Sequence, residues 1–219
     1  MKRIYFILSA LCVCLLASAQ SKKVEPFDRN TWHWTEHADQ YQYVAVEDGN
    51  LVISNLKKNK KYSDYQNMAK SFAKLPLRPQ DNFKLTIKYS VANYYITWYQ
   101  ILFNTSKQCL EDYEESGQFD TNMLLMMGPD WVLGIDDGSG KAPSGRLPGK
   151  VKAKGEYPME FVLEKKHKKV SIEVNGIELF EGECEISNPC IGFWTSFTSK
   201  GYSTIKIDEI IIEQADADD

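Results

Sequence analysis

Residues 170–180 read Val-Ser-Ile-Glu-Val-Asn-Gly-Ile-Glu-Leu-Phe, two short alternating segments joined by Asn175-Gly176. Alternation of apolar and polar residues is the period of a strand with one buried face. Asn and Gly accept the positive φ that a tight two-residue connection requires, so this stretch predicts a β-hairpin. Because the same pattern recurs along the chain, we expect an all-β protein.

Eleven segments carry this periodicity, with turn residues between them. They are residues 43–46, 51–56, 83–91, 94–103, 122–127, 131–135, 159–163, 170–174, 177–180, 191–197 and 203–213. Asp48-Gly49-Asn50 predicts a second hairpin turn by the same reasoning. Many short strands in a chain of 219 residues favour a β-sandwich of two antiparallel sheets in one domain.

Two segments depart from simple alternation. In the last one the apolar positions change parity between Ile207 and Ile210, which predicts a β-bulge at Asp208-Glu209. Between Tyr65 and Leu75 the apolar residues recur at helical spacing before Pro76, so this segment is either one short helix or an irregular edge strand.

The ends of the chain suggest export. Lys2 and Arg3, an apolar core and an Ala-Ser-Ala site before Gln20 indicate a signal peptide over residues 1–19. The folded domain would then span residues 20–214, followed by an acidic tail at 215–219. No later segment approaches the ~20 apolar residues that a membrane span requires. We therefore expect a soluble protein, periplasmic or secreted.

Charge and cysteine content limit the partners. The chain has 26 Lys+Arg against 30 Asp+Glu, a net charge of −4, which disfavours nucleic acid as a partner. The basic runs 57–61 and 165–169 are predicted to be solvated turns. Cys184 and Cys190 flank a turn and would be able to form a disulfide in an exported protein, but with Cys109 they make an odd number. Three buried free thiols are the equal alternative.

Several segments resemble the concanavalin A-like jelly roll and, within it, the 3-keto-disaccharide hydrolase domain family. The resembling stretches are 47–53, 83–89, Tyr99-Gln100-Ile101-Leu102, 170–180, Ile191-Gly192-Phe193 and 205–212. The resemblance covers about residues 40–213 and implies a jelly-roll sandwich. Where the family segment has two acids, this chain has Trp98 and Phe103, so a catalytic role attached to those acids is not inherited.

Catalytic and metal-binding patterns are weak. The stretch 33–37 fits H-x-x-E-H, a zinc pattern that needs a helix, yet it lies in a region of strand-like spacing where an ordinary strand and loop are expected. The acidic stretch 111–115 and Asp136-Asp137 would suit a solvated loop, calcium or a pair of catalytic carboxyls. His167, among four lysines, is expected to be exposed and idle. The expected cofactor is therefore none, with calcium as the one open possibility.

Aromatic residues are the most informative feature, with 5 Trp, 12 Tyr and 10 Phe. By strand parity, one face of 94–103 and one face of 191–197 carry aromatic rings with an amide and a hydroxyl between them. Such a surface suits sugar rings, which have apolar faces and polar rims. The predicted ligand-binding residues are Tyr94, Trp98, Gln100, Trp194 and Ser196, although the same tryptophans would also fit a sandwich core.

The sequence thus favours an exported domain that binds an oligo- or polysaccharide in an aromatic-lined concave groove. A glycan-active hydrolase or lyase of the concanavalin A-like class is the first alternative. A structural or protein-interaction domain without a small ligand is the second. Because no motif specifies a reaction, a binding domain is preferred over an enzyme.

Overall fold

The computed structural model describes residues 21–61, 67–92, 98–103, 123–127, 134–136, 159–196 and 203–214, and backbone alone at 98, 123–127, 134–136 and 196. Several sequence predictions lie outside the described residues. They are the signal peptide 1–19, Tyr94, the acidic stretch 111–115, Cys109, the long loop after Asp136 and the tail 215–219. Within the described ranges no helix is long and apolar enough to cross a membrane.

Every regular element in the described residues is a strand. The strands are β1 (Ser21–Glu25), β2 (His37–Ala38), β3 (Gln42–Glu47), β4 (Asn50–Asn55), β5 (Ala69–Lys74), β6 (Phe83–Ala92), β7 (Trp98–Phe103), β8 (Met123–Met127), β9 (Gly134–Asp136), β10 (Met159–Lys166), β11 (Lys169–Val174), β12 (Ile177–Glu183), β13 (Cys190–Ser196) and β14 (Ser203–Gln214).

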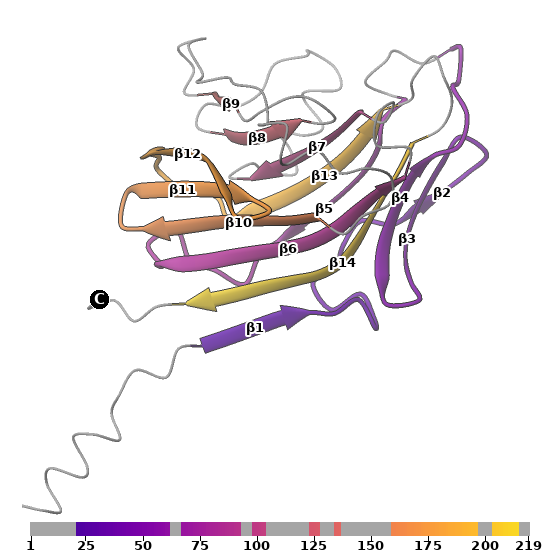
Figure 1. Cartoon of the computed structure of the whole chain (residues 1–219). Coiled ribbons are helices and arrows are strands. Elements are labelled where there is room, and N and C mark those ends of the chain that lie inside the picture. Colours follow the sequence, from indigo (N-terminus) through magenta and orange to yellow (C-terminus); the bar gives the residue numbers. More distant parts are fainter. Residues whose placement is uncertain are drawn as a thin grey trace, which may run out of the picture.

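The strands form two antiparallel sheets. A nine-stranded sheet has the order β12-β11-β10-β6-β14-β4-β3-β2, with β1 added to β14, and a five-stranded sheet has the order β5-β13-β7-β8-β9. Figure 1 shows the smaller sheet stacked above the larger one. The predicted all-β, jelly-roll sandwich is therefore confirmed.

Both predicted hairpin turns are present. Asp48 and Gly49 have φ of 49° and 73° between β3 and β4, and Asn175 and Gly176 have φ of 51° and 73° between β11 and β12. Positive φ at both central residues matches the twist of the flanking strands, which is why Asn-Gly and Asp-Gly pairs specify these connections.

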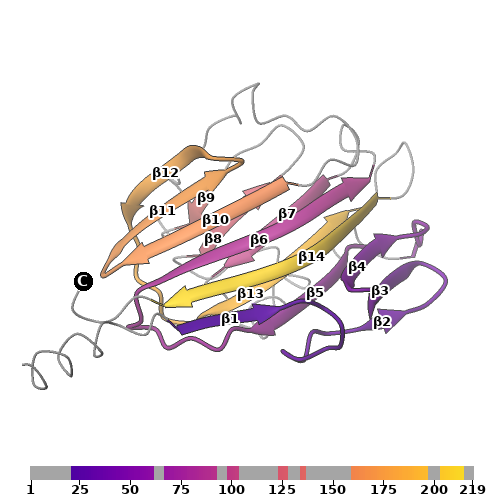
Figure 2. The same cartoon turned by 60° about the horizontal axis from the view of Figure 1, so that its bottom comes forward.

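The predicted bulge is present where β14 changes partner. Residues 203–207 pair with β4, whereas residues 210–214 pair with β1. Pairing with β6 shifts register between Ile207 and Glu209, leaving Asp208 as the extra residue. The shift returns Ile210 and Ile212 to the inner face, where both are fully buried. Figure 2 shows β1 lying along the C-terminal half of β14.

The ambiguous segment between Tyr65 and Leu75 forms an edge strand in its described part, since β5 pairs with β13 alone. The helical alternative is wrong there, because a neighbouring strand supplies hydrogen bonds that outweigh local spacing. The sequence did not predict β1 and β2, whose residues are mostly exposed and lack alternation.

The core lies between the two sheets and packs them against each other. Aromatic pairs cross it: Phe83 of β6 meets Phe103 of β7 at 5.9 Å between ring centroids, and Tyr89 meets Tyr99 at 5.8 Å. Polar links also cross it. The Tyr89 and Tyr99 hydroxyls are hydrogen-bonded at 3.2 Å, and the Asn55 side-chain amide donates to the backbone oxygen of Thr195 and, at 3.0 Å, to its hydroxyl. One face of β7 and β13 therefore packs in the core between the sheets, and the opposite face, which we call the outer face, points away from the larger sheet.

Candidate functional site

The predicted site falls on the outer face of the five-stranded sheet. Tyr99, Ile101 and Phe103 of β7 belong to the inter-sheet core, so Gln100 and Leu102 have the opposite parity. In β13 the alternation places Trp194 on this outer face as well, directly opposite Gln100 in the register.

The backbone register brings four of the five predicted residues into neighbouring rows. Trp194 pairs with Gln100, and Ser196 pairs with Trp98 one step further along the same two strands. Opposite residues in antiparallel strands have Cβ atoms ~5 Å apart, close enough for an aromatic ring and an amide to share a ligand. The fifth residue, Tyr94, lies outside the described residues.

Burial divides the residues of this outer face. Gln100 in β7 and Lys70 in β5 both pair with Trp194 in the register, and both are partly exposed. Trp194 is only 1% exposed, although it is not a member of the described core cluster between the sheets. The Trp194 ring is therefore covered, and Gln100 and Lys70 are the partly exposed residues beside it, although the Gln100 side-chain oxygen is buried.

Acidic residues are scarce on this face. At the described register positions of Gln100 parity in β5, β13, β7, β8 and β9, the one acidic residue is Asp136, opposite Met123. Glycoside hydrolysis needs two carboxyls ~5 to 9.5 Å apart. One acidic position in the described strands of this sheet does not make such a pair.

The zinc-like stretch His33-Trp34-Thr35-Glu36-His37 is not helical. His33 to Glu36 form an irregular loop, and His37 begins the two-residue strand β2. The Glu36 carboxylate accepts a hydrogen bond from the Val46 backbone N–H at 2.9 Å, and His37 lies 3.3 Å from Asp39. Across the described ranges no three His, Cys, Asp or Glu side chains are grouped so as to hold a metal ion.

One residue of the basic run 165–169 was predicted wrongly, whereas residues 166–169 are exposed. Lys165, expected on a solvated turn, is 4% exposed because it shares the inward parity of Phe161 and Leu163. Its ammonium donates a 2.8 Å hydrogen bond to the Asp81 carbonyl, and burial lowers the pKa of this amine. His167 at the following turn is exposed, as predicted.

The two described cysteines are free thiols. Cys184 and Cys190 are both buried, and burial raises the pKa of each thiol to about 11. The Cys190 thiol donates to the Ala73 carbonyl at 3.1 Å. Of the two alternatives that the sequence left open, the structure has the free thiols at these positions.

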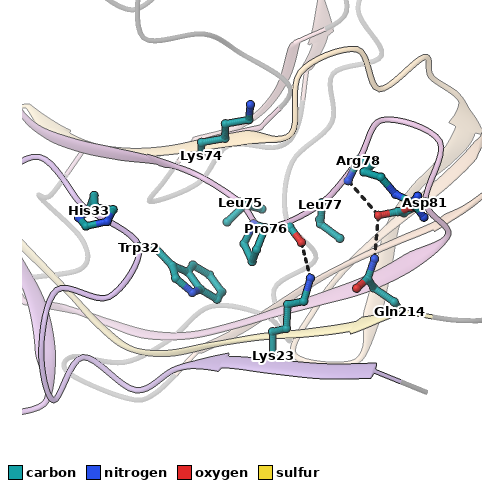
Figure 3. A pocket seen from close by; sticks show the side chains of 10 residues that line it. All are labelled: Lys23, Trp32, His33, Lys74, Leu75, Pro76, Leu77, Arg78, Asp81 and Gln214. Carbon is teal, nitrogen blue, oxygen red and sulfur yellow. Dashed lines mark hydrogen bonds and ion pairs between the residues drawn. The ribbon is translucent and has the colours of Figure 1, made fainter. Parts of the chain in front are cut away.

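A hollow that sequence reasoning missed lies at the open end of the sandwich, with a volume of about 630 Å³. It is lined by side chains from four separate segments: Lys23 of β1, Trp32, the run from Lys74 to Asp81 and Gln214 of β14 (Figure 3). No local motif unites them. The pairing of β1 with β14 brings two of the segments together, and hydrogen bonds from Lys23 to Pro76 and from Gln214 to Asp81 join the run from Lys74 to Asp81 to them. We refer to this hollow as the β1 groove.

Comparison with known proteins supports the fold and leaves the family open. No family model matches the sequence, and no curated protein matches it. A non-specific endo-β-1,3(4)-glucanase of family GH16 superposes with a TM-score of 0.63 at 14% identity, over 90% of this chain and 95% of that chain. The catalytic domain of a laminarinase from Thermotoga petrophila gives 0.59 at 11% identity, over 90% and 100%.

A third solved structure is a protein of unknown function with a galectin-like fold from Bacillus subtilis, at a TM-score of 0.51 and 15% identity, covering 88% of this chain and 95% of that chain. Identities this low establish architecture alone. The chain therefore has the concanavalin A-like jelly-roll fold, a class that includes both glycan-active enzymes and lectin-like proteins.

Proposed function

We propose that the protein is an exported carbohydrate-binding domain that holds an oligo- or polysaccharide on the outer face of its five-stranded sheet. The observation that carries this proposal is the row in which Gln100, partly exposed, stands opposite Trp194. A side-chain amide suits the hydroxyls of a sugar, which need hydrogen bonds, and an adjoining aromatic ring suits the apolar face of the sugar. Tyr94, Trp98 and Ser196 complete the proposed groove.

Two further parts of the proposal rest on the sequence. Export rests on the signal-peptide pattern of residues 1–19, and one domain over 20–214 rests on the even spacing of strands. Membership of the 3-keto-disaccharide hydrolase domain family rests on the resembling segments, of which Tyr99-Gln100-Ile101-Leu102 lies within β7. A calcium ion bound near Asp136 would be compatible with each of these.

A glycan-active hydrolase or lyase is the second candidate, supported by the fold shared with a glucanase and a laminarinase. It needs a second carboxyl beyond Asp136, from a residue outside the described ranges. A domain without a sugar ligand is the third.

A panel of neutral polysaccharides, assayed for binding and for release of reducing sugars with and without calcium, separates the three. We expect binding without product release. In the Gln100→Ala variant the affinity should fall up to about tenfold, the value of one neutral hydrogen bond.

The matched control is Gln42→Ala, which removes a half-buried glutamine from the other sheet and should leave binding unchanged. Release of reducing sugars would favour the hydrolase or lyase over the binding domain. If no polysaccharide binds, the carbohydrate proposal is wrong and the interaction domain is preferred.

A further inference from the structure

The β1 groove carries a local positive excess on an acidic protein. Its lining includes the cations of Lys23, Lys74 and Arg78 but one carboxylate, Asp81, while the whole chain has a net charge of −4. A cationic hollow within a low-dielectric surface raises the local concentration of anions. The surrounding negative charge opposes a long polyanion, so a ligand with one or few negative groups fits best.

Asp81 offsets one of the three positive charges, which leaves a positive excess, and its carboxylate is engaged by Arg78 and Gln214. One carboxylate oxygen accepts a 2.9 Å hydrogen bond from Arg78 Nε and forms an ion pair with Arg78 Nη2, also at 2.9 Å. The other accepts the Arg78 backbone N–H at 2.9 Å and the Gln214 amide at 2.7 Å. Against desolvation, which raises it, the hydrogen bonds and charge of Arg78 and the charge of Lys23 lower the pKa of Asp81, so the carboxylate stays charged and holds Arg78 in place.

The three cations keep donors for a ligand. The side chain of Arg78 is 74% exposed, so its remaining N–H groups point to solvent. Lys23 is anchored by a 2.7 Å hydrogen bond from Nζ to the Pro76 carbonyl, which uses one of its three donors. Lys74 is exposed and has no ion pair with any described residue. Groups held in place before binding lose less conformational entropy when they bind.

Trp32 supplies an aromatic wall at one end of the groove, beside Pro76 and Lys23 in Figure 3. Its ring is half-buried, and its backbone N–H donates a 2.7 Å bond to the buried Glu25 carboxylate. The loop that presents it has Phe27 and His33 at φ of 58°, a conformation that is costly for a bulky residue. The loop is thus held in an unfavourable backbone shape that keeps the indole at the groove.

A ligand for this arrangement must combine an apolar face for the indole with an anionic group for the cations. A uronic acid or a sulfated sugar has this chemistry, because its ring presents C–H groups and its substituent carries the charge. We propose that the β1 groove is a second carbohydrate subsite, specific for an acidic sugar residue, with Trp32 against the ring and Lys74, Arg78 and Lys23 around the anion. The choice of a sugar rests on the proposed carbohydrate function, although the groove lies on different strands from Gln100.

Titration calorimetry with trigalacturonate, its methyl ester and a sulfated disaccharide tests the subsite on the full chain, including the three aspartates after Gln214. We expect the acid to bind more tightly than the uncharged ester, with an affinity that falls as salt is added. Binding of the sulfated disaccharide in place of the uronate would identify which anion the groove accepts. Lys74→Gln should weaken acid binding on the order of fivefold, and Trp32→Phe should weaken it less than Trp32→Ala.

The matched control is Lys84→Gln, which removes an exposed lysine from the outer face of β6 and should leave acid binding unchanged. Equal binding of ester and acid, equal effects of Lys74→Gln and Lys84→Gln, or binding of inorganic sulfate as tight as that of the trisaccharide would overturn the subsite. Gln100→Ala should not alter acid binding. Failure of neutral-glycan binding with intact acid binding therefore contradicts the outer-face proposal alone.

Discussion

At the scale of single residues, Glu25 is a buried carboxyl with 0% exposure that holds the Trp32 loop. Burial raises its pKa above the usual range, against the backbone hydrogen bonds that lower it. Ionising it therefore costs more in the folded state than in the unfolded chain. The stability that the protonated Glu25 contributes is fully present below the ordinary carboxyl pKa. It is lost as pH rises through the raised pKa of the folded state.

Glu25→Gln removes this titration while keeping a carbonyl oxygen for the Trp32 N–H. We expect the free energy of unfolding of the wild type, relative to the variant, to decrease as pH rises above the ordinary carboxyl pKa of about 4 and through the raised folded-state pKa. Urea unfolding at a series of pH values measures the difference. If the free energy of unfolding of the wild type instead increases relative to the variant as pH rises, the ionised carboxylate is better stabilised than its burial indicates.

Asn55 is the second residue whose role is decided by burial. Its side-chain amide joins β4 to Thr195 of the other sheet, and it is 1% exposed. Asn55→Ala leaves the acceptors on Thr195 buried without this donor, so we expect a loss of about 1–3 kcal/mol in the free energy of unfolding. Asn50→Ala, in the same strand but at an exposed turn, should cost less than about 0.5 kcal/mol. Equal losses in thermal or urea denaturation would contradict the inter-sheet link.

At the scale of elements, the tight turn between β11 and β12 depends on the backbone conformation of Gly176. Gly176 has φ of 73° and open space around it, so the backbone conformation and not crowding selects glycine there. Gly176→Val should cost about 1–2 kcal/mol of stability, because left-handed backbone is unfavourable for a β-branched residue. Gly176→Asn should retain most of that stability, since Asn tolerates this conformation. Denaturant unfolding of the two variants measures the difference, and equal costs would contradict the argument.

Sequence patterns predicted elements well where one face is buried. The bulge at Asp208 followed from isoleucine parity alone, since burial of Ile207 and Ile210 on one face leaves no other geometry. The strand β1 could not be predicted, because Ser21-Lys-Lys-Val-Glu has no alternation and its pairing is supplied by the free edge of β14. Lys165 was misplaced because charge suggested solvent while strand parity required the interior.

At the scale of the whole molecule, the candidate sites differ in how far sequence could predict them. Gln100 and Trp194 lie in strands with clear alternation, so their shared face followed from parity, while the burial of Trp194 depends on what packs over it. The β1 groove is assembled from segments up to 191 positions apart, from Lys23 to Gln214. No local pattern encodes such a site, because long-range strand pairing creates it.

The burial of both described thiols predicts that their reactivity depends on whether the whole domain is folded. In a chain that begins at Gln20 and carries Cys109→Ser, Cys184 and Cys190 are the remaining cysteines. A thiol pKa of about 11, against an ordinary value of 9.0, lowers the reactive thiolate at pH 8 by about a hundredfold, and burial also blocks access. Both thiols should therefore stay unlabelled by an aromatic disulfide reagent in buffer, and both should react in guanidinium. Rapid labelling in buffer would contradict the packing around β13, and labelling in denaturant only after a reductant is added would reveal a disulfide.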